Sequence, residues 1–307
     1  MVVAVTGASG FVGKALMRRL GEGAQALSLR SAVPDISGTS DISDGSAWTS
    51  QLKHVDCVVH LAARVHVMHD TAADPLADFR AVNVALSLQL AQAAVAAGVR
   101  RLIYLSSVKV NGDNTLAGKP FRESDLAQPP DPYGVSKWEA ENALLAFARN
   151  NPLEVVIIRP PLVYGPGVKA NFARLINLVG KGIPLPFAAL DNRRSLVSID
   201  NLVDFIICAM QHKSAAGEVF MVSDGDDIST PELIRRIAHA QGRSARLLAV
   251  PPSALQWIGK ISGKSDVVER LCGNLQVDIE KARVILGWQP RYSMQECLKR
   301  TVHTLAP

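Results

Sequence analysis

A tyrosine and a lysine four residues apart are the first side chains in this sequence whose types and spacing suggest chemistry. The segment Tyr133-Gly134-Val135-Ser136-Lys137 opens a predicted helix over Val135–Asn150, so the phenol and the ammonium group share one helix face. A neighbouring ammonium group favours the phenolate and lowers the pKa of a tyrosine toward neutrality. Tyr133 can then pass a proton to or from a carbinol oxygen.

Two serines stand where they can assist that proton transfer. Ser106 and Ser107 follow the apolar run Leu102–Leu105, which predicts a buried strand. Hydroxyl groups at the carboxyl end of a parallel strand lie at the sheet edge where ligands bind in open α/β folds. Ser107 can hydrogen-bond the same substrate oxygen as Tyr133, although either serine can instead cap a loop.

A glycine-rich segment near the N-terminus predicts a dinucleotide site. Its spacing is G-x-x-G-x-x-G, and it lies between the apolar run Val2–Val5 and a predicted helix over Phe11–Leu20. Glycines allow a tight turn and let the backbone approach a pyrophosphate, whose charge the helix N-terminus stabilises. A purely structural glycine turn is the alternative. We expect cofactor contacts from Gly7, Ser9, Gly10, Phe11, Val12 and Gly13.

The end of the second predicted strand favours a phosphorylated cofactor. Arg30 follows the strand Ala26–Leu29, at a point where an acidic residue normally accepts hydrogen bonds from the adenosine ribose. An arginine pairs instead with a 2′-phosphate, which indicates NADP(H) in preference to NAD(H). The structural alternative is a solvated surface arginine. Asp41 and Ile42 are candidate contacts of the adenine.

Alternating strands and helices must position these residues. Buried strands are predicted at the β-branched runs Val2–Val5, Ala26–Leu29, Val55–Leu61, Leu102–Leu105 and Val155–Ile158. Helices are predicted between them at Phe11–Leu20, Pro75–Ala97 and Val135–Asn150. The alternation predicts an α/β fold, a Rossmann-like doubly wound parallel sheet with a smaller C-terminal substrate-binding lobe.

Prolines and glycines become frequent after Arg159, and the predicted elements become shorter. Helices are expected at Asn171–Val179, Asn201–His212, Pro231–Gln241, Glu280–Leu286 and Met294–Thr304, with a strand at Val219–Val222. We expect a cofactor-binding domain over residues 1–165, joined by roughly residues 194–225, and a second lobe formed by residues 166–193 and 226–307.

The composition excludes several classes of protein. The 307 residues include 33 Lys+Arg and 28 Asp+Glu, and 48% are hydrophobic, which indicates a folded chain and gives little support to a nucleic-acid partner. The four cysteines lie far apart, which argues against a disulfide framework and for a reducing, cytoplasmic compartment. No acidic or cysteine ligand completes a metal site with His60, His66 and His69.

One stretch, from Ala81 to Val99, carries no charged residue. Polar residues such as Asn83, Ser87 and Gln89 would be costly in the hydrocarbon of a membrane. We therefore expect a helix buried on more than one face of a soluble protein, with no membrane partner, and the N-terminus shows no signal-peptide pattern.

Several ordered motifs together resemble a known family. The chain resembles an extended short-chain dehydrogenase/reductase of the nucleotide-sugar epimerase/dehydratase group over nearly its whole length. The motifs that carry this resemblance are the glycine turn, Asp41-Ile42, His60-Leu61-Ala62-Ala63, Asn83, Ser106-Ser107, Tyr133 to Lys137, Arg159-Pro160-Pro161-Leu162-Val163-Tyr164-Gly165-Pro166-Gly167 and Leu286-Gly287-Trp288-Gln289-Pro290.

The resemblance implies a set of roles. Catalysis would use Ser107, Tyr133 and Lys137, with Lys137 also holding the nicotinamide ribose. The second lobe would bind a UDP-sugar, and two long helices would form a homodimer through a four-helix bundle, covering the uncharged Ala81–Val99 face. Further cofactor contacts implied by the motifs are Leu61, Ala62, Ala63, Asn83, Pro160 and Val163.

Departures from the family pattern narrow the reaction. Related sugar 4,6-dehydratases carry an acidic pair where this chain has Val108-Lys109, and no local carboxylate replaces it. The tyrosine common in 4-epimerases just after that point is absent, because the sequence continues Val110-Asn111-Gly112. The segment resembles the 4-ketoreductases that form UDP-N-acetylquinovosamine in O-antigen synthesis, some of which carry the name UDP-glucose 4-epimerase.

With Arg30, these departures favour an NADPH-dependent reduction of the 4-keto group of a UDP-4-keto-6-deoxy-N-acetylhexosamine. Three alternatives stay open: an NAD-dependent UDP-sugar 4-epimerase, a non-catalytic cofactor-sensing protein, and an NADP-dependent reductase of a non-sugar ketone. Guanidinium groups match phosphate oxygens, so the diphosphate is expected at basic residues of the second lobe. The candidate substrate contacts are Lys109, Asn171, Arg194 and Arg270, while Arg193 can simply face water.

Overall fold

A computed structural model of the chain describes residues 1–28, 46–65, 74–261, 263 and 265–304. Within this part of the chain, six parallel strands form one sheet in the order β2-β1-β3-β4-β5-β8. The strands are β1 (Val3–Thr6), β2 (Ala24–Leu27), β3 (Cys57–His60), β4 (Arg101–Leu105), β5 (Glu154–Arg159) and β8 (Val219–Met221). The predicted Rossmann-like α/β fold is therefore confirmed.

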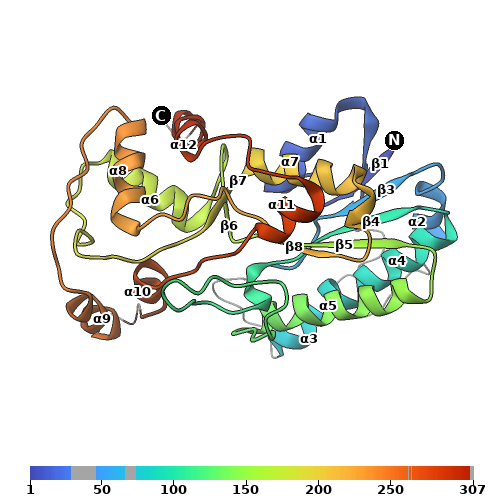
Figure 1. Cartoon of the computed structure of the whole chain (residues 1–307), viewed down its shortest axis with the longest axis horizontal. Coiled ribbons are helices and arrows are strands. Elements are labelled where there is room, and N and C mark those ends of the chain that lie inside the picture. The colour runs from blue at the N-terminus through green and yellow to red at the C-terminus, as the bar shows by residue number, and fades with distance from the viewer. Residues whose placement is uncertain (29–45, 66–73, 262, 264, 305–307) are drawn as a thin grey trace.

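Helices cover both faces of the sheet, as Figure 1 shows. α1 (Phe11–Leu20) and α7 (Ile199–Gln211) pack together on one face, and α4 (Leu86–Ala96) and α5 (Pro132–Arg149) lie on the other. Each face has its own core of aliphatic side chains, in which the central strands are buried on both sides. The absence of polar alternation in these segments therefore correctly predicted the strands of a parallel sheet that is covered on both faces.

The predicted helix over Pro75–Ala97 contains an irregularity. It consists of α3 (Pro75–Arg80), a π-helical turn over Ala81–Ala85 and α4. The stretch from Pro75 to Ala96 is long and apolar enough to span a membrane, but 44% of its apolar window is buried inside the protein and α4 packs against α5. It is thus a core helix of the larger lobe.

The strand order reverses at the boundary between β1 and β3. The chain passes from β1 to β2 on one side and then to β3 on the other side of β1. Open α/β sheets bind ligands in the crevice outside the carboxyl ends of the strands at such a switch point. The glycine turn after β1 and the segment after β3 border this crevice.

The second lobe lies at the other end of the molecule (Figure 1). It contains its own hydrophobic core, which includes Phe172 and Ile176 of α6 and Ile234 of α8. Two short parallel strands, β6 and β7, join the lobes. The remaining elements are α2 (Ser46–Gln51), β6 (Leu162–Tyr164), α6 (Ala170–Gly180), β7 (Leu196–Ser198), α8 (Thr230–Ala240), α9 (Pro252–Ile261), α10 (Ser265–Cys272), α11 (Glu280–Leu286) and α12 (Met294–His303).

The chain returns to the main sheet through β7, α7 and β8. β8 pairs with β5 at the edge of that sheet. Arg101, at the start of β4, donates to the carbonyl groups of Ala209, Met210 and His212 at 2.6, 3.0 and 2.8 Å. These bonds satisfy the C-terminal carbonyls of α7 and fix that helix to the sheet.

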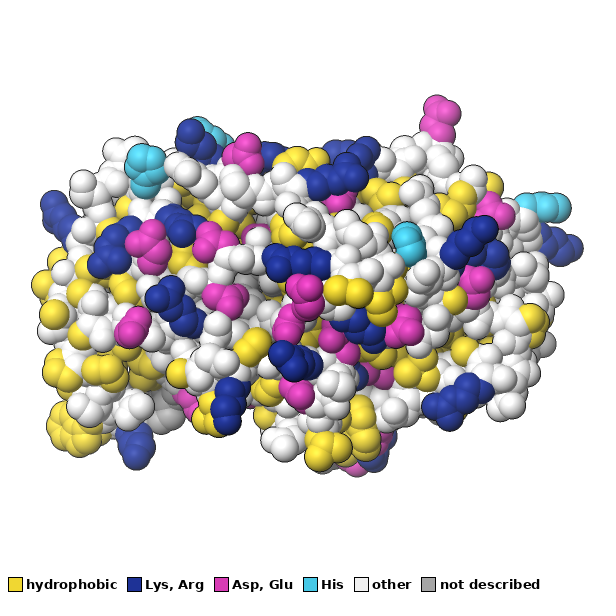
Figure 2. Space-filling model, viewed as in Figure 1, with side chains coloured by type: hydrophobic (Ala, Val, Ile, Leu, Met, Phe, Trp, Pro, Cys, Tyr) yellow, Lys and Arg dark blue, Asp and Glu magenta, His cyan; other side chains and the backbone are white. Residues whose placement is uncertain are grey.

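Charges of both signs are interspersed over the face shown in Figure 2. Several lie in pairs, such as Arg236 with Glu232 and Lys281 with Glu218. The positive excess is therefore spread over the surface and does not by itself indicate a binding face.

Candidate active site

The glycine turn has the geometry that a dinucleotide site requires. Gly7 has a positive φ of 67°, and a Cβ at this position would lie 2.8 Å from the Ala62 nitrogen. A Cβ on Gly13 would lie 2.1 Å from the Gly7 carbonyl oxygen, so helix α1 approaches the turn closely only because this residue is glycine. Gly10 is the N-cap of α1 and supplies no side-chain cap, which leaves the first amide groups of the helix available to an anion.

The other predicted residues of this turn lie on different sides of it. Ser9 is exposed at the turn, and Val12 packs on the core beneath α1. Phe11 packs against the core of the second lobe, so the first residue of α1 touches both lobes. The backbone of the turn thus fits a pyrophosphate, and the cradle lies where the two lobes meet.

The segment after β3 is tied directly to the turn through Thr6. The Thr6 hydroxyl accepts from the amides of Leu61 and Ala62, each at 3.2 Å, and pairs with His60 Nδ1 at 2.6 Å. Ala63 follows in the same partly buried segment. These bonds place Leu61–Ala63 beside the glycine turn, on the side of the crevice where the cofactor contacts are expected.

Asn83 has a positioning role that the sequence did not reveal. Its side-chain amide group donates to the Arg64 carbonyl at 3.1 Å and to Ser136 Oγ at 2.9 Å, and its expected contact with the cofactor stays a prediction. Its carbonyl oxygen accepts from the Arg64 amide at 2.9 Å. The side chain therefore joins the loop after β3 to α5, and both of its amide protons are used within the protein.

Ser107 and Tyr133 meet at the carboxyl edge of the sheet. Ser107 follows β4, and Tyr133 lies in the first turn of α5, which begins at Pro132, before the predicted start at Val135. Asp131 caps this helix by accepting from the Gly134 amide at 2.7 Å, and proline at the first position favours the same start. The Ser107 hydroxyl lies near enough to the Tyr133 phenol to lower the pKa of that phenol.

Burial controls the pKa of the phenol in this structure. It raises the pKa of Tyr133 to about 12, although the nearby Ser107 hydroxyl opposes the rise and the Asp131 charge adds to it. We expected Lys137 to lower that pKa. Instead, the Lys137 ammonium group donates to Tyr104 Oη at 3.0 Å and to the Leu105 carbonyl at 2.7 Å.

Lys137 is itself strongly affected by its surroundings. Burial lowers its pKa to about 7, while the charge of Glu141, one helical turn later, opposes that shift. Glu141 is in turn held by Arg159 at the end of β5, with Nε to carboxylate distances of 3.0 and 3.1 Å. Arg159 also donates to the Asn111 side chain at 3.0 Å, so Asn111 has a structural role at this point.

Two carboxylates lie close to the Lys109 side chain. The Lys109 ammonium group forms ion pairs with Asp113 and, at 3.1 Å, with Asp131. Asp131 is 22 positions away in sequence and reaches this point because the turn Val108–Val110 packs against the first turn of α5. The Lys109 ammonium group is therefore engaged with two carboxylates of the protein, and its expected contact with the substrate stays a prediction.

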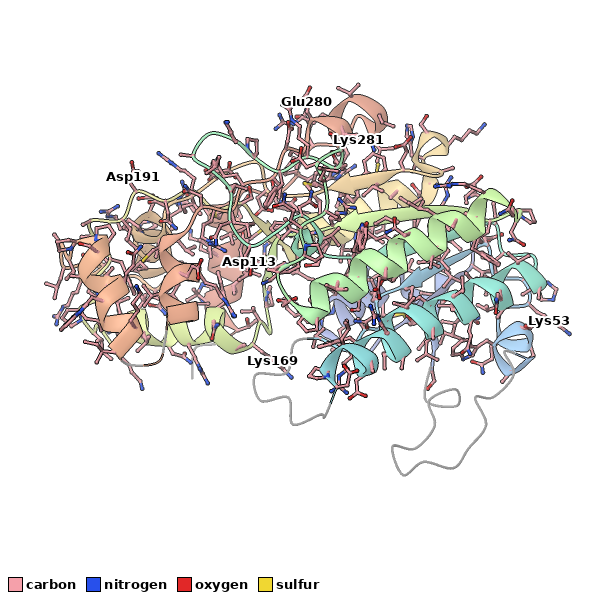
Figure 3. All side chains as sticks on the ribbon, turned by 90° about the horizontal axis from the view of Figure 1, so that it is seen from below. Lys53, Asp113, Lys169, Asp191, Glu280 and Lys281 are labelled. Atoms are coloured by element: carbon pink, nitrogen blue, oxygen red, sulfur yellow. The ribbon has the colours of Figure 1, made fainter. Side chains whose placement is uncertain are left out.

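The second lobe brings two predicted arginines together. Arg194 lies between the lobes and donates to the Gly273 carbonyl at 3.0 Å. Burial and the nearby Arg270 guanidinium group lower the pKa of Arg194, whereas Asp113 raises it. Two neighbouring guanidinium groups repel each other, so an anion between them would be stabilising. In Figure 3, Asp113 lies where the lobes meet, near the start of α5.

The remaining predictions have mixed outcomes. Asn171 is exposed in the first turn of α6, directly after Ala170, whose φ is 54°. Pro160 follows β5 and accepts from the Val108 amide at 3.0 Å, and Val163 lies in β6 against the core. Arg30, Asp41 and Ile42 lie outside the described residues, as do His66 and His69.

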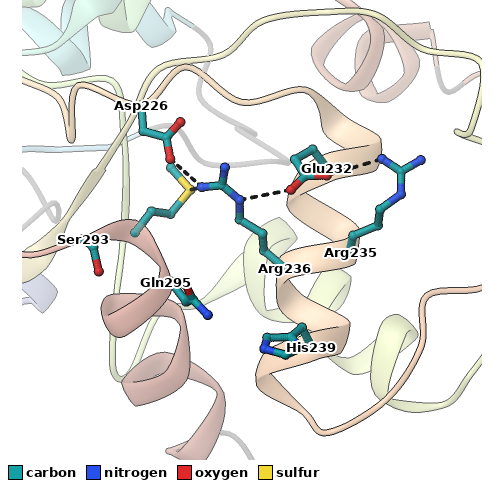
Figure 4. A pocket seen from close by; sticks show the side chains of 8 residues that line it. Asp226, Glu232, Arg235, Arg236, His239, Ser293 and Gln295 are labelled. Carbon is teal, nitrogen blue, oxygen red and sulfur yellow. Dashed lines mark hydrogen bonds and ion pairs between the residues drawn. The ribbon is translucent and has the colours of Figure 1, made fainter.

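A separate hollow of about 490 Å³ lies between α8 and α12 (Figure 4). Two arginines line it: Arg236 pairs with Asp226 and with Glu232 at 3.2 Å, and Arg235 pairs with Glu232 at 3.4 Å. Both arginine charges thus have carboxylate partners within the hollow. Arg194 differs, because no ion-pair partner of it is found in the described ranges, and it fits a diphosphate better.

Several residues of the site could be found only in the structure. Thr6, Tyr104 and Glu141 contact His60, Lys137 and Arg159, but nothing in their local sequence marks them. Asp131 is different, because an aspartate directly before a proline is a helix-start signal. That signal would have placed Tyr133 inside the helix.

Comparison with known proteins agrees with this geometry. Residues 3–223 match the NAD dependent epimerase/dehydratase family. A relative from Vibrio cholerae named UDP-glucose 4-epimerase is 48% identical, over 97% of this chain and 94% of that protein.

Solved structures show the same fold. The UDP-glucuronic acid 4-epimerase from Bacillus cereus in complex with NAD has a TM-score of 0.75 at 21% identity and covers 99% of this chain and 98% of its own. RMD from Pseudomonas aeruginosa, complexed with NADPH, has a TM-score of 0.76 at 22% identity and covers 99% of each chain. With a matched sequence family, a relative of nearly full length and the intact serine, tyrosine and lysine, the chain belongs to the NAD dependent epimerase/dehydratase family of extended short-chain dehydrogenases/reductases.

Proposed function

We propose that the protein is an NAD-dependent 4-epimerase of a UDP-sugar. The observation that carries this proposal is the 48% identity, over almost the whole chain, to the relative named UDP-glucose 4-epimerase. It replaces our expectation of a 4-ketoreductase, which rested on the sequence around Ser107 and on Arg30. The geometry at Ser107 and Tyr133 supports either reaction, because both move one proton and one hydride at a sugar carbon.

The chain offers a consistent place for each part of the ligands. The amide groups of the glycine turn at Gly7 and Gly10 would hold the pyrophosphate of the dinucleotide, and Lys137 would hold its nicotinamide ribose. Arg194 and Arg270 would bind the diphosphate of the sugar nucleotide, with Asn171 at the edge of that site. We propose that residues 166–193 and 226–307 form this substrate lobe.

Tyr133 is the acid and base of the proposed reaction. In the first half, the C4 hydroxyl of the sugar loses its proton to the Tyr133 phenolate, C4 loses a hydride, and a ketone forms. In the second half, Tyr133 returns the proton to the same oxygen while C4 regains the hydride on the opposite face. A bound nicotinamide dinucleotide would supply the hydride acceptor and donor, so the cycle is redox-neutral. Ser107 orients the oxygen between itself and the phenol.

A 4-ketoreductase is the second candidate, because Arg30 follows the second predicted strand where a 2′-phosphate would be recognised. The two functions differ in stoichiometry. A reductase consumes one reduced cofactor for every sugar, whereas an epimerase consumes none.

The decisive experiment follows the sugar and the cofactor together. Purified protein with catalytic NAD and no reduced cofactor is mixed with UDP-glucose, and UDP-galactose is measured by chromatography; we expect the two sugars to reach equilibrium. In parallel, NADPH oxidation is followed with a UDP-4-keto-6-deoxy-N-acetylhexosamine. Stoichiometric NADPH oxidation without epimer exchange would instead establish the reductase.

We also propose that two copies associate through α4 and α5. These helices pack side by side on the outer face of the sheet (Figure 3), α4 carries no charged residue, and Trp138 of α5 keeps 40% of its surface exposed. Pairing would cover this apolar surface. Light scattering of the purified protein should therefore give twice the mass of one 32.9 kDa chain.

A further inference from the structure

The short turn that carries Lys109 is pressed against the helix that carries Tyr133. A Cβ on Gly134 would lie 2.9 Å from the Lys109 carbonyl oxygen, so the two backbones meet at a position that only glycine permits. Ser107 begins the turn, and its hydroxyl accepts from the Lys109 amide at 3.2 Å. The two hydroxyl-bearing residues of the proposed reaction thus belong to two elements in direct contact.

Asp131 joins these two elements with its two carboxylate oxygens. Oδ1 accepts from the Gly134 amide at 2.7 Å and caps α5, while Oδ2 lies 3.1 Å from the Lys109 ammonium group. The same ammonium group pairs with Asp113, four positions later on its own side of the contact. One cation therefore serves two carboxylates at the edge of the site.

We propose that Lys109 is a positioning residue that holds Asp131 against α5 and neutralises its charge beside the Tyr133 phenol. This inference rests on the proposed function, since it assigns to Lys109 the control of the proton transfer at Tyr133. The proposed role differs from that of a residue that binds the sugar, because the Lys109 ammonium group is already directed at two carboxylates. It also differs from a simple surface ion pair, because its partner caps the catalytic helix.

The surroundings of the phenol explain why this charge matters. Among the described residues, the groups close to Tyr133 include the Ser107 hydroxyl, the Asp131 carboxylate and the Tyr104 phenol. The Phe79 ring also lies there, with its centroid 6.0 Å from that of the Tyr133 ring. The Lys137 ammonium group is directed to Tyr104 and Leu105. The negative charge of Asp131 therefore favours the protonated phenol, and Lys109 is the cation that offsets it.

Lys109 engages both carboxylates at this edge of the site. Asp113, four residues later, and Asp131, the N-cap of α5, each form an ion pair with its ammonium group. The proposed reaction protonates and deprotonates one sugar oxygen and must not eliminate water. Carboxylates held in ion pairs with Lys109 are not available to promote that elimination.

The test removes the charge of Lys109 and follows the pH dependence of turnover. In Lys109→Met, Asp131 is no longer neutralised, and the limb of the kcat profile that reports Tyr133 should move to higher pH. A shift of roughly half a pH unit or more is expected for the loss of one nearby charge at a partly solvated site. The limb should move to higher pH in epimerisation and in reduction alike, because in each reaction it reports the ionisation of the Tyr133 phenol.

Two further variants separate this role from a structural one. Lys109→Arg keeps the positive charge. The limb of its kcat profile should therefore stay at the wild-type pH, whatever the size of kcat itself. Asparagine is a good helix cap, so Lys109→Met combined with Asp131→Asn removes the carboxylate whose charge raises the pKa of Tyr133. The double variant should therefore return the limb to the wild-type pH or below. A lower kcat in Lys109→Met with an unmoved limb, or no recovery in the double variant, would overturn the proposal.

The proposed function and this inference can fail separately. If the wild type turns over neither UDP-glucose nor the keto sugar, the proposed function fails. The ionisation of the Tyr133 phenol is then measured by ultraviolet absorbance. For the wild type and for each variant, the absorbance of the same protein carrying Tyr133→Phe is subtracted. At one alkaline pH at which circular dichroism shows a folded protein, the ionised fraction should be lower in Lys109→Met than in the wild type. Equal fractions would overturn the inference by itself.

Discussion

Two adjacent hydroxyl groups at the end of β4 have different surroundings. The Ser107 hydroxyl lies beside the Tyr133 phenol and accepts from the Lys109 amide. Ser106 is buried, its amide donates to the Ile158 carbonyl at 2.7 Å, and its hydroxyl has no hydrogen-bond partner within the described ranges. Successive residues of an extended chain point to opposite sides, so only one of the two serines can face α5. A difference of one position decides which hydroxyl can take part in the reaction.

We therefore predict that Ser107→Ala lowers kcat by roughly 100-fold, since it removes the hydroxyl that would hydrogen-bond the reacting oxygen beside the phenol. The matched variant Ser106→Ala should stay within about threefold of the wild type, because it deletes an oxygen that bonds nothing. Steady-state kinetics at saturating UDP-sugar measure both. A larger loss in Ser106→Ala than in Ser107→Ala would show that the two roles are reversed.

At the scale of elements, the unit β1–turn–α1 depends on close backbone approach. The Gly10 amide bonds the Gly7 carbonyl at 2.9 Å, and the helix begins immediately afterwards. A Cβ on Gly13 would meet the Gly7 carbonyl oxygen at 2.1 Å and Ala8 Cα at 2.7 Å, and both of these are rigid backbone atoms. The helix must shift to accept any side chain at this position.

Gly13→Ala should therefore destabilise the protein by about 1–3 kcal/mol, the usual range for a forced overpacking. It should also weaken NAD binding, because α1 can no longer present its N-terminus to the turn. Gly23→Ala, in the loop before β2, is the control: its Cβ would lie 3.8 Å from the nearest atom, an ordinary contact. Urea unfolding and calorimetric titration with NAD compare the two. Equal affinities in the two variants would refute the role given to α1.

At the scale of the whole molecule, a buried chain of hydrogen bonds links the two halves of the sheet and α4. His60 Nδ1 pairs with Thr6 at 2.6 Å and Nε2 with Ser87 at 2.9 Å, and the Ser87 hydroxyl donates to the Asn83 carbonyl at 2.7 Å. Burial, and to a lesser degree the Lys137 charge, lowers the pKa of His60 to about 3. The folded protein therefore keeps this imidazole neutral.

This predicts a loss of stability in mild acid. An unfolded histidine binds its proton below about pH 6.5, whereas the folded His60 does not until about pH 3, so the unfolded state gains protons first as the pH falls. The contribution of His60 is present above pH 6.5 and should decrease by about 2 kcal/mol by pH 5. Urea unfolding at several pH values measures the change.

In His60→Gln this part of the pH dependence should disappear. It should persist in His303→Gln, because His303 lies at an exposed position of α12. A slope retained in His60→Gln would assign it to another group.

The sequence by itself determined the local parts of this protein. The glycine turn, the four-residue spacing of Tyr133 and Lys137 and the alternation of buried strands with helices depend on neighbours within a few positions. Backbone sterics and helix periodicity act over that range, so these patterns predicted the parallel α/β fold and the identity of the proposed acid and base. Helix starts were less certain, as the shift of α5 from Val135 to Pro132 shows.

Only the tertiary structure decided what those residues contact. Lys137 turns to Tyr104, Asn83 joins Arg64 to Ser136, and Lys109 closes on Asp131. Each of these partnerships joins residues about 20 or more positions apart, and it forms because α4, α5 and the turn after β4 pack on one another. No local preference of the chain encodes such a distance. The charges that control Tyr133 are therefore set by packing, whereas Tyr133 itself could be read from the sequence.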